Sequence, residues 1–332
     1  MSERREFFAA GAGLAASALL SSCTQVKPES STAGTEHWST KRTPQGEVKL
    51  FLWRKRLAEA PKGPLVFVHG SSVQSVPAFD LQVPGQPQSS VMDWFAHLGY
   101  DTWCFDCEGY GRSDKWRPVN ADISCGADDL AVVSDFIFRA TNQNLLLYGA
   151  SSGALRAGLF AQRHPERVRR IVLDALVYTG EGSPTLAERK KRLPQYRASN
   201  RRPIDRAFVR SIFTRDGNPD AYDPAIVERF ADQVLALDTS MPTGTYVDMS
   251  ANLPVLDPSK IRVPTTILRG QWDGIATEKD LLDFFARLPH PDKQFTFMPG
   301  IAHSSLRSRN WRMVYDLVDS CCSRTAPVYT GA

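Results

Sequence analysis

Short apolar runs alternate with amphipathic patterns through most of the chain. Seven runs have the length of a strand, and most of them lack polar alternation, which is typical of strands buried on both faces. They occupy residues 49–57, 63–70, 100–106, 144–150, 169–176, 264–270 and 293–300. Apolar residues recur at helical spacing in segments 90–99, 127–141, 153–166, 278–288 and 311–322. This order predicts an α/β fold in which a mostly parallel sheet lies between two layers of helices.

The alternation stops between residues 177 and 258, where no core strand is indicated. These 82 residues are too many for a loop inside a compact sheet, so we expect an inserted helical cap. Residues 181–216 hold ten Arg or Lys and four Asp or Glu, whereas residues 217–260 hold two and seven. Either the two halves attract each other across a solvated face, or the basic half attracts an anionic substrate or anionic lipid headgroups.

The composition limits the classes of function. The chain has 332 residues, of which 42% are hydrophobic and 23% charged, as in ordinary globular proteins. A net charge of +4 without a basic stripe gives no reason to expect a nucleic-acid partner. No internal repeat occurs at a fixed period. The oligomeric state does not follow from these patterns.

The amino terminus has the pattern of an export signal. An arginine pair precedes an apolar run (7–20) that is too short to span a bilayer, which indicates a signal peptide in residues 1–22. The pair resembles a twin-arginine signal, and the sequence LSSC resembles a lipobox that ends at Cys23. We expect an exported bacterial lipoprotein that faces the periplasm or the cell exterior. Lipid at Cys23 would anchor it to the membrane through a polar tether, residues 23–36.

The remaining cysteines do not indicate a disulfide framework. They are five in number, so they cannot all pair within the chain, and no two pairs have the spacing of a zinc site. They are Cys104, Cys107, Cys125, Cys321 and Cys322. We therefore expect neither a fold that depends on disulfides nor a cysteine metal site.

The sequence GASSG, residues 149–153, predicts a candidate nucleophile. It follows a buried strand and precedes a helical pattern, which is the setting that a nucleophile elbow requires. Small residues on both sides allow a strained turn that leaves the hydroxyl of Ser151 exposed above the sheet. The positive end of the following helix points at the same place.

A serine hydroxyl needs a base, and the base needs an acid that orients it. Among the six histidines, His303 lies on a loop after the last predicted strand, at the edge of the sheet where sites of this architecture gather. Asp273 follows the preceding strand and is the candidate acid. Asp174, at the end of an earlier strand, is the alternative acid.

The negative charge of a transition state also needs donors. The backbone N–H of Ser152, directly after the candidate nucleophile, is one. The second is expected in the turn after VFVHG, either the N–H of Ser71 or, if the loop is shifted, that of Ser72.

The order Ser151, Asp273, His303, the HGSS turn, the DCEGYGRSD segment and the insertion after IVLDAL together resemble the α/β-hydrolase superfamily with a cap. This resemblance extends over about residues 40–325. It implies about eight strands, a site between sheet and cap, and no cofactor. The predicted domains are 37–176 and 259–325 for the core and 177–258 for the cap.

Serine members of this superfamily cleave several kinds of bond, and ester hydrolysis is the commonest. We therefore expect a serine hydrolase that cleaves a small carboxylic ester through an acyl-enzyme. An aminopeptidase or amidase of the proline-iminopeptidase type and a carbon–carbon bond hydrolase are alternatives. A ligand-binding lipoprotein on the same fold is the alternative that is not an enzyme.

Overall fold

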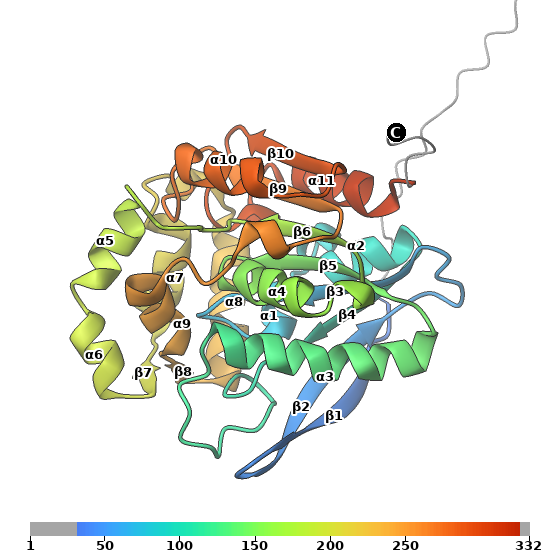
Figure 1. Ribbon diagram of the computed structural model, residues 1–332, viewed down its shortest axis with the longest axis horizontal. Coiled ribbons are helices and arrows are strands. Elements are labelled where there is room, and N and C mark those ends of the chain that lie inside the picture. The colour runs from blue at the N-terminus through green and yellow to red at the C-terminus, as the bar shows by residue number, and fades with distance from the viewer. Residues whose placement is uncertain (1–31, 326–332) are drawn as a thin grey trace, which may run out of the picture.

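The computed structural model describes residues 32–325, which fold around a sheet of eight strands (Figure 1). Across the sheet the strands follow the order β1-β2-β4-β3-β5-β6-β9-β10. β2 is antiparallel to both of its neighbours, and the pairs from β4 to β10 are parallel. The prediction of a mostly parallel sheet is therefore confirmed. The strands are β1 (Thr35–Thr43), β2 (Gly46–Lys55), β3 (Gly63–Val68), β4 (Tyr100–Phe105), β5 (Leu145–Ala150), β6 (Val168–Asp174), β9 (Thr265–Gly270) and β10 (Lys293–Met298).

The edge strand β1 was not among the predicted strands. Thr35 and Glu36, which the sequence assigned to the end of the polar tether, already pair with Arg54 and Trp53 of β2. The physical reason is that β1 is an edge strand with mostly exposed or half-exposed side chains, so it has no apolar run.

Helices cover both faces of the sheet. α3 (Ile123–Thr141), α4 (Ser152–Arg163) and α10 (Glu278–Arg287) pack into the apolar cluster on one face. α2 (Val91–His97) and α11 (Trp311–Ser323) pack into the cluster on the other. Figure 1 shows α3 and α4 in front of the sheet. The two predicted helical layers are therefore present.

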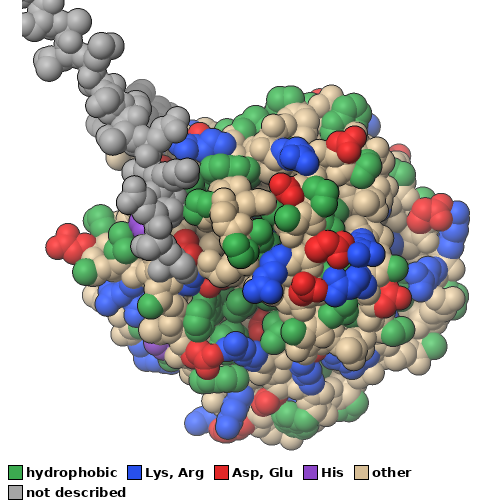
Figure 2. Space-filling model, turned by 180° about the vertical axis from the view of Figure 1, so that it is seen from behind, with side chains coloured by type: hydrophobic (Ala, Val, Ile, Leu, Met, Phe, Trp, Pro, Cys, Tyr) green, Lys and Arg blue, Asp and Glu red, His purple; other side chains and the backbone are tan. Residues whose placement is uncertain are grey.

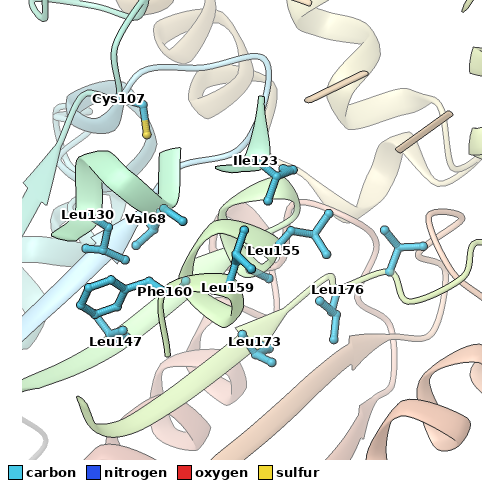
Figure 3. Packing of buried hydrophobic residues seen from close by; sticks show 14 of the residues in the cluster. Val68, Cys107, Ile123, Leu130, Leu147, Leu155, Leu159, Phe160, Leu173 and Leu176 are labelled. Carbon is cyan, nitrogen blue, oxygen red and sulfur yellow. The ribbon is translucent and has the colours of Figure 1, made fainter. Parts of the chain in front are cut away.

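Adjacent residues of the buried strands point to opposite faces, as the pleat of a strand requires. Val68 of β3, Leu147 of β5 and Leu173 of β6 lie in the cluster with Leu155 and Phe160 of α4 (Figure 3). Each such side chain contributes about 1.5–3 kcal/mol when it leaves water. This packing holds the amino-terminal end of α4 in place above the sheet.

The segment between β6 and β9 consists mainly of helices and lies to one side of the sheet, at the left of Figure 1. We call residues 177–258 the inserted segment. Its elements are α5 (Pro184–Lys190), α6 (Leu193–Ala198), β7 (Arg201–Pro203), α7 (Arg206–Thr214), α8 (Pro224–Leu237), β8 (Ser240–Pro242) and α9 (Gly244–Val247). The remaining short helices are α1 (Ser75–Phe79), η1 (Pro87–Ser89), η2 (Pro165–Arg167), η3 (Pro219–Ala221), η4 (Asp248–Asn252), η5 (Pro258–Lys260) and η6 (Ser305–Arg307).

The outer surface carries both signs of charge. On the face in Figure 2, Lys and Arg side chains lie among Asp and Glu side chains, which accords with the small net charge. Among residues 32–325, no helix combines the length and the apolar character needed to cross a bilayer. The predicted signal peptide, Cys23 and most of the predicted tether lie outside the described residues.

Candidate active site

The candidate nucleophile lies in a strained turn between β5 and α4. Ser151 has φ 58° and ψ −124°, a conformation that L-residues rarely adopt. Its N–H donates a hydrogen bond of 2.9 Å to the carbonyl oxygen of Asp174, so the adjacent strand β6 holds the turn. This backbone geometry is the one expected of a nucleophile elbow.

Two glycines make this turn sterically feasible. A Cβ on Gly153 would lie 2.1 Å from the carbonyl oxygen of Val68, and a Cβ on Gly149 would lie 2.4 Å from the carbonyl oxygen of Gly153. Backbone atoms cannot move aside as a flexible side chain can. The close approach of α4 to β3 therefore requires glycine at position 153, and the tight turn from β5 into α4 requires glycine at position 149.

The turn after β3 lies against the elbow. Ser71 Oγ donates a hydrogen bond of 2.8 Å to Ser152 Oγ, and a Cβ on Gly70 would lie 4.0 Å from Ser151 Oγ. The N–H of Ser152 is at the first position of α4, where helical geometry supplies no acceptor. The turn after β3 meets the elbow after β5 because β3 lies between β4 and β5 in the sheet: the chain goes from β3 to its neighbour β4 and then crosses to β5 on the other side of β3. Such a reversal of strand order is where α/β sheets form binding crevices.

His69 supports this turn as a neutral side chain. Its Nδ1 bonds the carbonyl oxygen of Gly70 at 2.8 Å, and its Nε2 accepts from the N–H of Cys107 at 3.1 Å. Burial and the nearby charge of Arg156 lower the pKa of His69 to about 3. A histidine that stays neutral and uses both nitrogens for backbone contacts has a structural role.

His303 lies in the loop after β10, and its Nδ1 is 2.8 Å from Asp273 Oδ1 in the loop after β9. Both side chains are buried. Burial acts to raise the pKa of Asp273, but the contact with His303 and the hydrogen bond from the N–H of Ile275 outweigh it and lower this pKa. An ionised Asp273 can only accept, so Nδ1 of His303 donates, and in the neutral imidazole Nε2 is then the nitrogen that can act as a base.

Asp174, the alternative acid, has different partners. Its Oδ2 accepts hydrogen bonds from the hydroxyls of Tyr148 and Ser305. Burial, together with the charge of Asp273, raises the pKa of Asp174 to about 7 against the effect of these two bonds. Among the described residues, the carboxylate that bonds the imidazole of His303 is that of Asp273.

Ser151 and His303 line one pocket. The turn after β3 forms one wall, and the loop after β10 forms another. The inserted segment closes the pocket with apolar residues and two arginines: Ile212, Phe213, Phe230, Arg189 and Arg215. Ser151 Oγ makes no hydrogen bond with His303 in the described part of the chain, and such bonds often form only when a substrate is bound.

Residues 85–310 match the Hydrolase_4 family, described as "Serine aminopeptidase, S33". The match covers 226 of the 332 residues. The chain belongs to this family. It is thus a hydrolase of the α/β-hydrolase superfamily, as the resemblance of its motifs implied.

Solved structures support the fold of this hydrolase. The malate-bound structure of a thermophilic esterase from Thermogutta terrifontis is 18% identical over 86% of this chain and 97% of its own, with a TM-score of 0.64. A hydrolase from Pseudomonas aeruginosa PA01 is 16% identical over 86% and 98%, with a TM-score of 0.64. An esterase from Exiguobacterium antarcticum is 15% identical over 87% and 100%, with a TM-score of 0.62. Among curated proteins, none matches this chain.

Several residues of the hydrolase that contact the site were not predicted from the sequence. Asp216 Oδ2 accepts from the N–H of His303 at 3.0 Å, and the hydroxyl of Tyr222 accepts from the N–H of Ser304 at 3.1 Å. Arg189 and Arg215 line the pocket. The excess of basic residues over 181–216 marked this region but did not distinguish these arginines from the others.

One cluster of side chains away from the pocket has the composition of a metal site. Glu108, Cys125 and Asp129 bring possible ligand atoms close together. The ammonium of Lys41 lies 2.7 Å from Glu108 and also contacts Asp129, and Arg117 lies 2.6 Å from Glu108, so two cations already pair with these two carboxylates. The cluster therefore fits a buried ion-pair network better than a metal centre.

Proposed function

We propose that this hydrolase cleaves carboxylic esters through an acyl-enzyme, with Ser151 as nucleophile, His303 as base and Asp273 as the residue that orients His303. The observation that carries the proposal is the 2.8 Å bond between His303 and Asp273 at the pocket that the elbow serine also lines. The three residues come from the ends of β5, β9 and β10, in the order that the sequence predicted.

In the first half-reaction, Nε2 of His303 takes the proton of the Ser151 hydroxyl while Oγ attacks the ester carbonyl. The carbonyl oxygen becomes an oxyanion, for which the backbone N–H groups of Ser152 and Ser71 are the proposed donors. His303 then returns the proton to the leaving alkoxide, the alcohol departs, and the acyl group stays on Ser151.

In the second half-reaction, water replaces the alcohol. His303 takes one proton from the water, and the hydroxide attacks the acyl-enzyme through a second tetrahedral intermediate. The proton then passes to Ser151 Oγ, and the carboxylic acid leaves. Throughout, Asp273 stays ionised and stabilises the imidazolium form of His303.

The charge of the pocket favours an ester over a peptide with a free amino terminus. An aminopeptidase needs a negative group to hold the substrate ammonium, yet no Asp or Glu is among the residues that line this pocket in the described chain. Arginines line it instead. A protonated amine would therefore be repelled, despite the name of the family.

A fluorophosphonate probe tests the proposal. Stoichiometric labelling of the wild type, together with hydrolysis of 4-nitrophenyl esters, is expected; Ser151→Ala should abolish the labelling and lower turnover by at least about 10³-fold. Exposed Ser259 provides the matched control, Ser259→Ala, which should behave as the wild type. An unlabelled wild type would indicate a binding protein. Faster cleavage of aminoacyl-4-nitroanilides than of the esters would favour the aminopeptidase.

A further inference from the structure

Four arginines surround the candidate site, and three of them have no acidic partner within 4 Å in the described chain. Arg189, Arg215 and Arg307 line the pocket, and Arg202 lies beside the turn after β3. Within residues 32–325, the one carboxylate within 4 Å of these guanidiniums is that of Asp216, whose Oδ1 is 3.9 Å from Arg215 Nε.

Buried cations elsewhere in the described chain use their donors, either in ion pairs or, as Arg156 does, in hydrogen bonds to uncharged oxygens. Lys41 contacts Glu108 and Asp129, and Arg170 lies 2.7 Å from Asp292. Charge is costly to bury unless it is paired. The arginines at the pocket therefore require an explanation.

Two of the four have a structural explanation. Arg307 is 5% exposed and donates to the backbone carbonyl oxygens of Ser89, Pro77 and Ala78, which uses its terminal nitrogens. Arg202 is 9% exposed and donates to Ser72 Oγ at 2.8 Å. It also stacks on two aromatic rings, those of Phe208 and Tyr246.

The other two have unused donors. Arg189 lies over the ring of Tyr246 at 4.3 Å, and its one polar contact in the described chain is with the sulfur of Met249 at 3.9 Å. The guanidinium of Arg215 makes no hydrogen bond in this part of the chain, so its buried Nε, 3.9 Å from Asp216 Oδ1, has no hydrogen-bond acceptor. Both side chains face the pocket that Ser151 lines.

The charges of Arg189, Arg202 and Arg215 all act on the hydroxyl of Tyr246, which indicates that the three arginines form one group. Although burial acts to raise the pKa of Tyr246, the charges of Arg189, Arg202 and Arg215 together lower it to about 7. Asp216, whose Oδ1 is 3.9 Å from Arg215 Nε, and Asp273 also interact with the charge of Arg215, but neither carboxylate accepts a hydrogen bond from Arg189 or Arg215 in the described chain. The donors of these two guanidiniums therefore remain for a ligand.

The basic half of the inserted segment thus separates into two sets. On the outer side, Arg206 lies 2.6 Å from Asp232, and both Arg206 and Arg210 contact Glu228, so the two halves do attract each other there. Arg189 and Arg215 take no part in this attraction, and they face inward.

We propose that Arg189 and Arg215 bind a carboxylate of the substrate, so that the preferred substrates are esters that carry a free carboxylate group. This inference rests on the proposed ester hydrolysis. Two guanidiniums suit a carboxylate because their planar donors match its two oxygens. The apolar walls formed by Ile212, Phe213 and Phe230 suit a hydrocarbon portion between the carboxylate and the ester.

Matched pairs of esters test the proposal and show whether the acyl half or the alcohol half of the preferred substrate carries the carboxylate. On the acyl side, 4-nitrophenyl hemisuccinate is compared with 4-nitrophenyl butyrate; on the alcohol side, 4-acetoxybenzoate is compared with phenyl acetate. We expect kcat/KM for the charged member of one pair to exceed that of its neutral partner by at least about tenfold. Arg215→Gln and Arg189→Gln should each remove most of this preference through KM.

Neutral esters and a matched arginine provide the controls. Within each variant, kcat/KM for the charged ester is compared with that for its neutral partner, and circular dichroism with thermal unfolding shows that both variants fold. Arg210→Gln, on the exposed side of the same segment, should retain the preference for the charged ester. Equal kcat/KM for charged and neutral esters in both pairs would overturn the inference and leave the proposed function intact.

If no ester is cleaved and the probe does not label Ser151, the proposed function fails, and carboxylate binding is tested by itself. Calorimetric titration of the full protein with glutarate should then give binding in the wild type and in Arg210→Gln, and at least about tenfold weaker binding in Arg215→Gln. Absence of glutarate binding in the wild type would overturn the anion site.

Discussion

Ser71 Oγ donates a hydrogen bond of 2.8 Å to Ser152 Oγ, which joins the turn after β3 to the first turn of α4. Each residue also carries one of the two N–H groups proposed to stabilise the oxyanion. The side-chain bond therefore fixes the separation of the two backbone donors, and correct placement of such donors is a large part of the rate of acyl transfer.

Loss of this bond should lower kcat more than it raises KM. Ser71→Ala and Ser152→Ala keep the backbone donors but release them from each other, so we expect a fall in kcat of about tenfold for either. The double variant should be little slower than each single variant, because one bond accounts for both effects. Strictly additive losses in steady-state kinetics would show that the bond does not position the donors.

Asp273 and Asp174 should differ sharply in their effect on turnover. Asp273→Asn replaces the acceptor for His303 Nδ1 with a group that can present N–H, and kcat should fall by about 10³–10⁴-fold. Asp174→Asn alters a carboxyl group that contacts Tyr148 and Ser305, so kcat should stay within about tenfold of the wild type. A larger loss of kcat in Asp174→Asn than in Asp273→Asn, at pH 8 with the same ester, would identify Asp174 as the orienting acid.

Asp174 should also make the free energy of unfolding depend on pH. Its pKa is raised to about 7 in the folded protein, whereas an aspartate in an unfolded chain has a pKa of about 3.9. The folded state therefore holds the proton more tightly. The stabilisation, up to about 4 kcal/mol, is complete below the unfolded pKa and is lost as the pH rises toward 7.

Urea unfolding at pH 5 and pH 8 measures this dependence. The wild type should lose stability between these values, and the neutral variant Asp174→Asn should lose less. Asp273 has a lowered pKa, so its own contribution disappears only below about pH 4 and does not affect the comparison. If the free energy of unfolding falls equally in the two proteins between pH 5 and pH 8, Asp174 is already ionised at pH 5.

Replacement by alanine at two glycines of α4 should have different effects on the free energy of unfolding. In Gly153→Ala the new Cβ would lie 2.1 Å from the backbone oxygen of Val68, and we expect the free energy of unfolding to fall by about 3 kcal/mol or more. In Gly158→Ala the contact is with Cδ1 of Leu256 at 2.8 Å, which can rotate away. Alanine is favoured over glycine in a helix by about 1 kcal/mol, so this control should be neutral or stabilised. Equal losses in thermal unfolding would contradict the close approach of α4 to β3.

The sequence alone was sufficient to predict those features of the protein that depend on residues close together in the chain. The GASSG sequence and the strand before it are contiguous in the chain, so their pattern predicted a nucleophile elbow, although the backbone that excludes a side chain at Gly153 belongs to the distant strand β3. The alternation of buried strands and amphipathic helices likewise predicted a mostly parallel sheet between two layers of helices. The edge strand β1 was missed because half-exposed polar residues can form a strand only when a partner supplies the hydrogen bonds.

Only the tertiary structure decided which distant side chains meet. Asp174 and Asp273 both follow strands of the sheet, and the packing of their loops places Asp273 next to His303 and Asp174 next to Tyr148. The basic residues of the inserted segment are alike in sequence, yet the burial of its helices turns Arg189 and Arg215 toward the pocket and leaves Arg210 outside. Local patterns specify the backbone of a site, whereas side-chain neighbours depend on how remote segments pack.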